Sequence, residues 1–173
     1  MVRSALASKR IGQGPVMGAE YMPAASVVLG TFVSALPIVA ESGWFPDFGF
    51  LMLIAWRLLR SDVWPSWWAA PLGLANDLIT GSPVGLSVTV WTVAMLALDL
   101  LDRRTQWRDY WIEWGIAALF IALAELAQWR VAALLGASVP LGVTAGPAIL
   151  VGILCFPIPA FLAARIDRWR LGR

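Results

Sequence analysis

The feature that most constrains this chain is the spacing of its basic residues. Six apolar segments can be drawn through it, over residues 22–40, 44–59, 63–80, 86–101, 112–135 and 141–164. Every Lys and Arg except Arg130 lies before the first segment, in or beside alternate gaps, or after the last segment. Because loops that carry Lys and Arg stay in the cytoplasm, this alternation predicts a six-transmembrane-helix bundle with both termini cytoplasmic.

The composition agrees with a membrane protein. Of the 173 residues 60% are apolar and 14% are charged, and the mean hydropathy is +0.74. A soluble domain of this size could not bury that much apolar surface. Because each membrane helix needs about 17 to 25 residues, six of them occupy nearly the whole chain. We therefore expect an all-α integral membrane protein with a cytoplasmic lead-in over 1–21, a membrane domain over 22–164 and a basic cytoplasmic tail over 165–173.

The charge and the missing residue types exclude several functions. The net charge of +2 is spread over four juxtamembrane segments, so membrane lipid explains it and no nucleic-acid partner is expected. The chain has no His and a single Cys, which excludes His-based acid–base pairs and the common zinc sites. An intramembrane aspartyl protease would need two facing aspartates, but Asp77 and Asp99 are predicted at opposite ends of adjacent helices. We expect no enzymatic activity, no cofactor and no metal.

Polar residues gather in the predicted outer half, where membrane charges usually face protein or water. Glu125, Gln128 and Trp129 stand at i, i+3 and i+4, on one face of a helix. Arg130 points away from that face, toward a pairing with Asp77 or Asp47 or toward the interface. Two roles stay open for these polar residues: joining helices, or forming a site for a partner or ligand. The candidates for such a site are Asp47, Asn76, Asp77, Glu125 and Arg130.

The most distinctive stretch runs from Gly73 to Gly85. Asp77 lies one helical turn before Gly81, and a Ser-Pro turn with Pro83 follows, so we expect a tight outer corner that begins the next helix. Small residues four apart indicate close helix contacts. They occur as the pairs Gly30 and Ser34, Ala69 and Gly73, and Gly142 and Gly146.

This stretch resembles the rod shape-determining protein family MreD. The resemblance rests on Gly-Leu-x-x-Asp-Leu-x-x-Gly-x-Pro-x-Gly from Gly73 to Gly85, in which Gly73, Gly81, Pro83 and Gly85 are the structural positions. It is supported by Pro46-Asp47-Phe48 leading to Trp56-Arg57 and Arg60, and by the run from Leu98 to Arg104. The family often has a second acid where this chain has Asn76. Beyond Trp107 the resemblance is mainly one of hydropathy.

The resemblance implies a multi-pass subunit of the bacterial inner membrane that acts as a non-enzymatic scaffold in the cell-elongation complex. Such a subunit helps control cell shape and lateral peptidoglycan synthesis. It implies MreC as the direct partner and, within the complex, MreB, RodZ, RodA and a class B penicillin-binding protein. It also implies a fold similar to the S-components of energy-coupling-factor transporters. Asp47, Asp77 and Arg130 are then candidate polar anchors for an MreC helix.

A second interpretation belongs to another class of protein. The intramembrane prolines and the outer polar residues also fit a small-molecule binding or transport subunit that resembles an S-component. Broken helices line the substrate cavities of many transporters. This alternative predicts a cavity that opens toward the periplasmic side.

Overall fold

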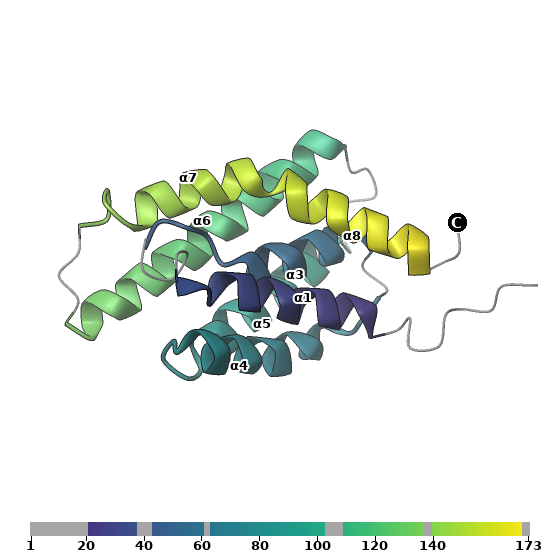
Figure 1. Ribbon diagram of the computed structural model, residues 1–173. Helices are drawn as coiled ribbons and strands as arrows, with labels where there is room; N and C mark the ends of the chain where they lie inside the picture. Colours follow the sequence, from purple (N-terminus) through teal and green to yellow (C-terminus); the bar gives the residue numbers. More distant parts are fainter. Residues whose placement is uncertain (1–20, 38–42, 61–62, 103–108, 137–139, 171–173) are drawn as a thin grey trace, which may run out of the picture.

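The computed structural model describes residues 21–37, 43–60, 63–102, 109–136 and 140–170. These residues form helices joined by short connections, as the sequence predicts (Figure 1). Counting α7 and α8 as one interrupted helix, the arrangement fits the expected six. The helices are α1 (Met22–Ser34), α3 (Phe48–Leu59), α4 (Ala69–Thr80), α5 (Leu86–Asp102), α6 (Tyr110–Leu134), α7 (Ala145–Cys155) and α8 (Pro157–Arg170), and a 3-10 turn, η1 (Ser66–Trp68), precedes α4.

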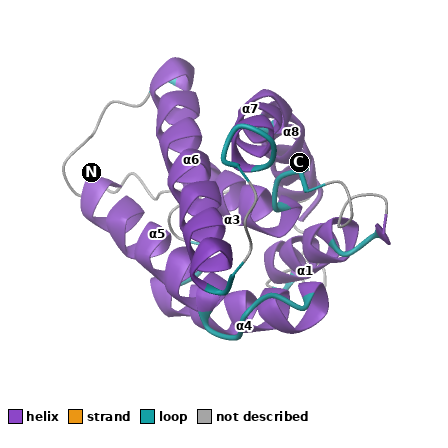
Figure 2. Ribbon diagram, turned by 90° about the vertical axis from the view of Figure 1, so that its left-hand side faces the viewer, coloured by secondary structure: helices purple, strands orange, loops and turns teal. Residues whose placement is uncertain are grey.

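Helix α3 forms the centre of the bundle. Every residue from Gly49 to Leu58 is buried. Apart from Arg57, the sequence of this helix is apolar on all sides, and a helix of that kind belongs in a core. Helices α1, α5, α6 and α8 pack around it (Figure 2). Trp56 of α3 and Trp91 of α5 are the largest fully buried side chains.

Two of the three predicted small-residue pairs mark close helix contacts. A Cβ at Gly30 would lie 2.8 Å from the carbonyl oxygen of Phe48, and one at Gly73 would lie 2.8 Å from the backbone of Ser87. Helix α1 can therefore approach α3, and α4 can approach α5, only because these positions lack a side chain. The third pair is a wrong prediction, since Gly142 lies in the turn before α7 with no atom near its Cβ position.

The helices run so that both ends of the described chain lie at the same end of the bundle. Near the start of α1, Ser26 accepts a hydrogen bond of 2.7 Å from the indole of Trp56. Near the end of α1, Ser34 accepts one of 2.9 Å from the backbone of Phe48. Helices α1 and α3 are therefore antiparallel, and α8 ends beside the start of α1 (Figure 1).

The described arginines other than Arg130 lie at one end of the bundle, which we call the basic end; they are Arg57, Arg60, Arg165, Arg168 and Arg170, and Asp99, Asp102 and Asp167 lie among them. We call the other end, which holds Asp47, Asp77, Glu125 and Arg130, the acidic end. The separation agrees with the alternation of basic residues in the sequence. The loop with Arg103, Arg104 and Arg108, and the lead-in up to residue 20, lie outside the described residues.

Within the described ranges, two helices are long and apolar enough to cross a membrane, judged by length and composition. They are α6, with 25 residues, and the interrupted helix α7–α8, with 26 residues from Ala145 to Arg170. Helices α1 and α3 are apolar but shorter, with 13 and 12 residues.

Several predicted boundaries need correction. Helix α1 ends at Ser34, and residues 38–40 of the first predicted span lie outside the described residues. The second starts at Phe48 because Asp47 caps it, its carboxylate accepting a hydrogen bond of 3.2 Å from the backbone of Phe50. The third starts at Ala69 rather than at residue 63, after the 3-10 turn that follows Pro65.

The last helix differs most from its prediction. It is interrupted at Phe156, because Pro157 and Pro159 have no backbone N–H to donate within the helix. It then continues to Arg170, so the segment predicted as a tail from residue 165 is helical as far as that residue.

Candidate functional site

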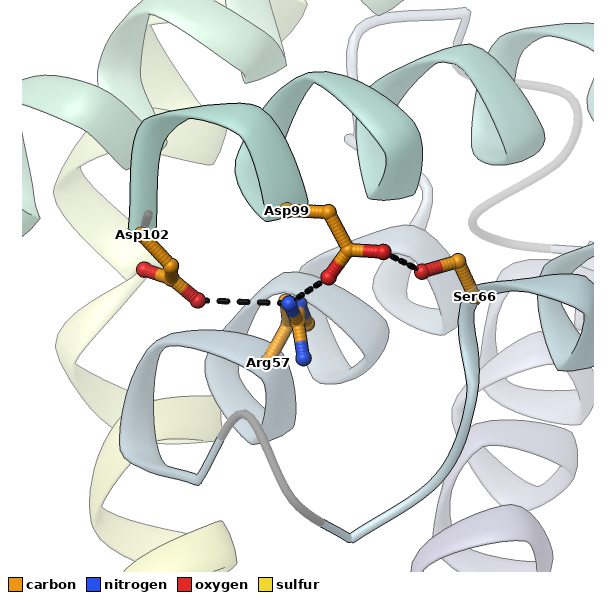
Figure 3. A network of polar contacts seen from close by, with 4 residues as sticks. All are labelled: Arg57, Ser66, Asp99 and Asp102. Carbon is orange, nitrogen blue, oxygen red and sulfur yellow. Dashed lines mark hydrogen bonds and ion pairs between the residues drawn. The ribbon is translucent and has the colours of Figure 1, made fainter. Parts of the chain in front are cut away.

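The best-connected polar network lies at the basic end, around Arg57 (Figure 3). Arg57 is 4% exposed, and its guanidinium forms ion pairs with Asp99 and, at 3.2 Å, with Asp102. Asp99 also accepts a hydrogen bond from the hydroxyl of Ser66. The network therefore joins α3, α5 and η1.

The position of Arg57 differs from the prediction. The alternation of charges assigned it to the second gap together with Arg60, yet it lies inside α3 and is buried. Asp99 and Asp102 stand at i and i+3 on α5, and this spacing was the available signal for a buried cation opposite them.

A second cluster closes the same end between α3 and α8. Arg60 forms an ion pair of 3.2 Å with Asp167, and Arg170 approaches the same carboxylate at 2.7 Å. Arg170 also lies over the indole of Trp56, 5.8 Å from the ring centroid. These contacts explain why the helix continues to Arg170.

At the acidic end, Asp77 holds the corner between α4 and α5. Its carboxylate accepts hydrogen bonds from the backbone of Gly85, at 2.7 Å, and of Ser87, at 2.9 Å. Asp77 is 1% exposed and satisfies donors at the first turn of α5, where the helix dipole favours a negative charge. Gly81 and Gly85 have φ values of +71° and +99°, which favour glycine. The tight corner predicted from the sequence is confirmed.

Asn76 connects three helices beside this corner. Its amide nitrogen donates to the carboxylate of Asp47 and to the hydroxyl of Ser87, both at 3.0 Å. Asn76 is 2% exposed. Its Oδ1 has no hydrogen-bond partner within the described part of the chain.

An acid at position 76, as the resembling family often has, would break this link. We expect Asn76→Asp to lower the free energy of unfolding by about 1–3 kcal/mol, because the carboxylate cannot donate to Asp47 or Ser87. Thermal denaturation of the purified protein in detergent, followed by circular dichroism, measures the change. An unchanged midpoint would show that the Asn76 hydrogen bonds add nothing to stability.

Glu125, Gln128 and Trp129 lie on one face of α6, as their spacing predicts. This face lines a cavity of about 490 Å³. A neighbouring cavity of about 250 Å³ shares Glu125 and Gln128 with it and reaches Asp47 and Asn76. The carboxylate of Glu125 lies against the backbone N–H of Asp47. Four of the five predicted site residues therefore lie close together at the acidic end. They are Asp47, Asn76, Asp77 and Glu125, and of these Asp77 lines neither cavity.

Arg130 stands apart from this group. Its side chain is exposed, and its guanidinium lies 5.2 Å from the ring centroid of Trp129. Over the described ranges it forms no ion pair with either Asp47 or Asp77, so neither pairing left open by the sequence is formed.

The two aspartates considered for a protease lie at opposite ends, as expected. Asp77 contacts the start of α5, whereas Asp99 lies near the end of the same helix and contacts the turn before α4. The other structural position of the motif, Pro83, lies in the corner and lines the larger cavity.

No protein-family model, curated protein or solved structure matches this chain. The resemblance to MreD thus rests on the residues of its motifs. In the structure these residues make the Asp77 corner, the cap of α3 at Asp47 and the network around Arg57.

Proposed function

We propose that this chain is a multi-pass subunit of the bacterial inner membrane that acts as a non-enzymatic scaffold in the cell-elongation complex. Its resemblance to MreD supports the proposal. MreC is the proposed direct partner, and MreB, RodZ, RodA and a class B penicillin-binding protein are proposed to join through the complex. Both termini are proposed to lie in the cytoplasm, which agrees with the position of the start of α1 and the end of α8 at the basic end.

The observation that carries this proposal is the use of the motif residues. Asp77 fixes the α4–α5 corner, Gly73 allows those helices to touch, and Arg57 ties α3 to α5. Residues with these roles maintain the shape of the bundle. A scaffold subunit depends on such a shape, because it presents a fixed surface to its partners.

The proposed partner surface lies on the outward faces of the long helices. Helix α6 exposes Leu119, Leu123 and Leu134 by 58%, 52% and 85%. Apolar helices gain little by leaving lipid for each other, so polar contacts help to select a partner. Of the three predicted anchors, Asp77 has both oxygens occupied and Asp47 caps α3, whereas the side chain of Arg130 is exposed.

Arg130 therefore gives the sharpest test. We expect Arg130→Ala to reduce the amount of MreC recovered with tagged protein from native membranes by about fivefold or more, as for the loss of one charge-assisted contact. The level of the protein in the membrane should not change, because the side chain is exposed. Mass spectrometry after purification in mild detergent measures both quantities.

Arg168→Ala is the matched control, since Arg168 is an exposed arginine at the opposite end. It should leave recovery unchanged. If unmodified protein recovers neither MreC nor elongation enzymes, the scaffold proposal fails. If it recovers MreC equally with and without Arg130, the scaffold proposal stands and the anchor is elsewhere.

A small-molecule binding or transport subunit is the second candidate. The cavity of about 490 Å³ at the acidic end favours it, because pockets of roughly 300–1,000 Å³ suit small ligands. A stoichiometric metabolite in the purified sample, without elongation partners, would support this candidate instead.

A further inference from the structure

We propose that the two adjoining cavities at the acidic end form one binding site for an organic cation, an amine with an apolar body. We call them together the acidic-end cavity. They share Glu125 and Gln128 and also Gly43 and Ser82. The inference goes beyond the scaffold role and does not depend on MreC.

Two carboxylates give the site its charge. Asp47 and Glu125 both line the smaller cavity, close enough to interact electrostatically. Neither forms an ion pair within the ranges that the structure describes. The nearest arginine along α6, Arg130, lies over Trp129 and does not line either cavity. Half-buried carboxylates without a cation favour a ligand that brings one.

Asn76 belongs to the same hydrogen-bond network, because its amide nitrogen donates to the carboxylate of Asp47 at 3.0 Å. It is 98% buried and lines the smaller cavity, and its Oδ1 lacks a donor in the described part of the chain. Buried acceptors are normally satisfied. An ammonium group has three N–H donors, so it can serve Glu125 and Asp47 together.

The larger cavity supplies the apolar part of the site. Its wall combines Glu125 and Gln128 with the side chains of Pro83, Leu86, Trp129 and Val131. An anion would meet two like charges there, and a neutral molecule would leave both carboxylates without a cation. The described residues contain no group of three His, Cys, Asp or Glu side chains that could hold a metal ion. The lining therefore selects an amine that carries several carbon atoms.

The test uses hexylammonium as the probe, with hexanol and hexanoate as its neutral and anionic counterparts. Purified full-length protein in detergent is titrated with each compound while tryptophan fluorescence is recorded. We expect a saturable change with hexylammonium only. The change should be lost in Trp129→Phe if that ring lines the site.

Glu125→Gln keeps the shape of the side chain and removes its charge. We expect it to weaken hexylammonium binding by about tenfold or more, as for the loss of one charge-assisted contact. Gln128→Glu adds a carboxylate to the same wall and should strengthen binding, so a folding defect in one variant cannot decide the result. Arg130→Ala should bind as the unmodified protein does.

Three outcomes would overturn the site. One is saturable binding of hexanol equal to that of hexylammonium. Another is an affinity for hexylammonium that neither Glu125→Gln nor Gln128→Glu alters. The third is the absence of saturable hexylammonium binding. Each of these results is independent of whether MreC is recovered.

Discussion

Arg57→Ala is expected to lower the free energy of unfolding by about 3–5 kcal/mol, the usual cost of removing one partner of a buried ion pair. The guanidinium is 4% exposed, and its loss removes the ion-pair partner that Asp99 and Asp102 share. Ser66 then remains as a hydrogen-bond donor to Asp99. The contact between α3 and α5 should therefore open first at the basic end.

Unfolding in mixed micelles of increasing SDS content, followed by circular dichroism, measures this loss. Arg168→Ala is again the control, because it removes an exposed arginine from the same end, and a surface change of this kind usually alters stability by less than about 0.5 kcal/mol. Equal stability of the two variants would contradict a structural role for the Arg57 network.

Asp77→Ala should lower the free energy of unfolding by about 3 kcal/mol. The carboxylate accepts backbone hydrogen bonds from Gly85 and Ser87, and each hydrogen bond to a charged group contributes about 1.5–3 kcal/mol. A methyl group accepts no hydrogen bond, so the backbone N–H groups of Gly85 and of the buried Ser87 lose their acceptor at the start of α5. The same denaturation experiment measures the effect.

Asp109→Ala is the matched control for Asp77. Asp109 also precedes a helix, α6, but it is exposed and its side chain makes no capping hydrogen bond. We expect a change below about 0.5 kcal/mol there. If both variants lose the same stability, the effect comes from charge near a helix start in general and not from the corner.

These expectations change how Asp77 can be used in partner experiments. The sequence suggested it as an anchor for an MreC helix, but an alanine there is expected to weaken the bundle itself. A loss of MreC after that substitution would have two causes. Arg130 avoids this difficulty, because its side chain makes no contact that the fold requires.

The sequence predicted the parts of the site that depend on neighbours along the chain. The α4–α5 corner followed from Asp77, Gly81 and Gly85, which lie within a few residues of one another. The shared face of Glu125, Gln128 and Trp129 on α6 followed from their i, i+3 and i+4 spacing. In each case helix geometry alone fixes which side chains lie together.

The parts that were missed depend on residues far apart in the sequence. Arg57 meets Asp99 across 42 positions, and Asn76 meets Asp47 across 29. A hydropathy pattern shows where charges occur, but it does not show which helices pack together. The helix ends were also misplaced, because the cap at Asp47 and the interruption at Pro157 act on hydrogen bonds that mean hydropathy does not record.

The heights of the helices differ across the bundle. Helices α1 and α4 measure about 20 and 18 Å at 1.5 Å per residue, whereas α6 measures about 37 Å. The hydrocarbon core of a bilayer, ~30 Å thick, is therefore thicker than the length of α1 and α4 and thinner than the length of α6. Such hydrophobic mismatch is relieved by local thinning of the lipid or by tilting of the protein. For the membrane subunit proposed above, any thinning of the lipid would thus be greatest beside α1 and α4.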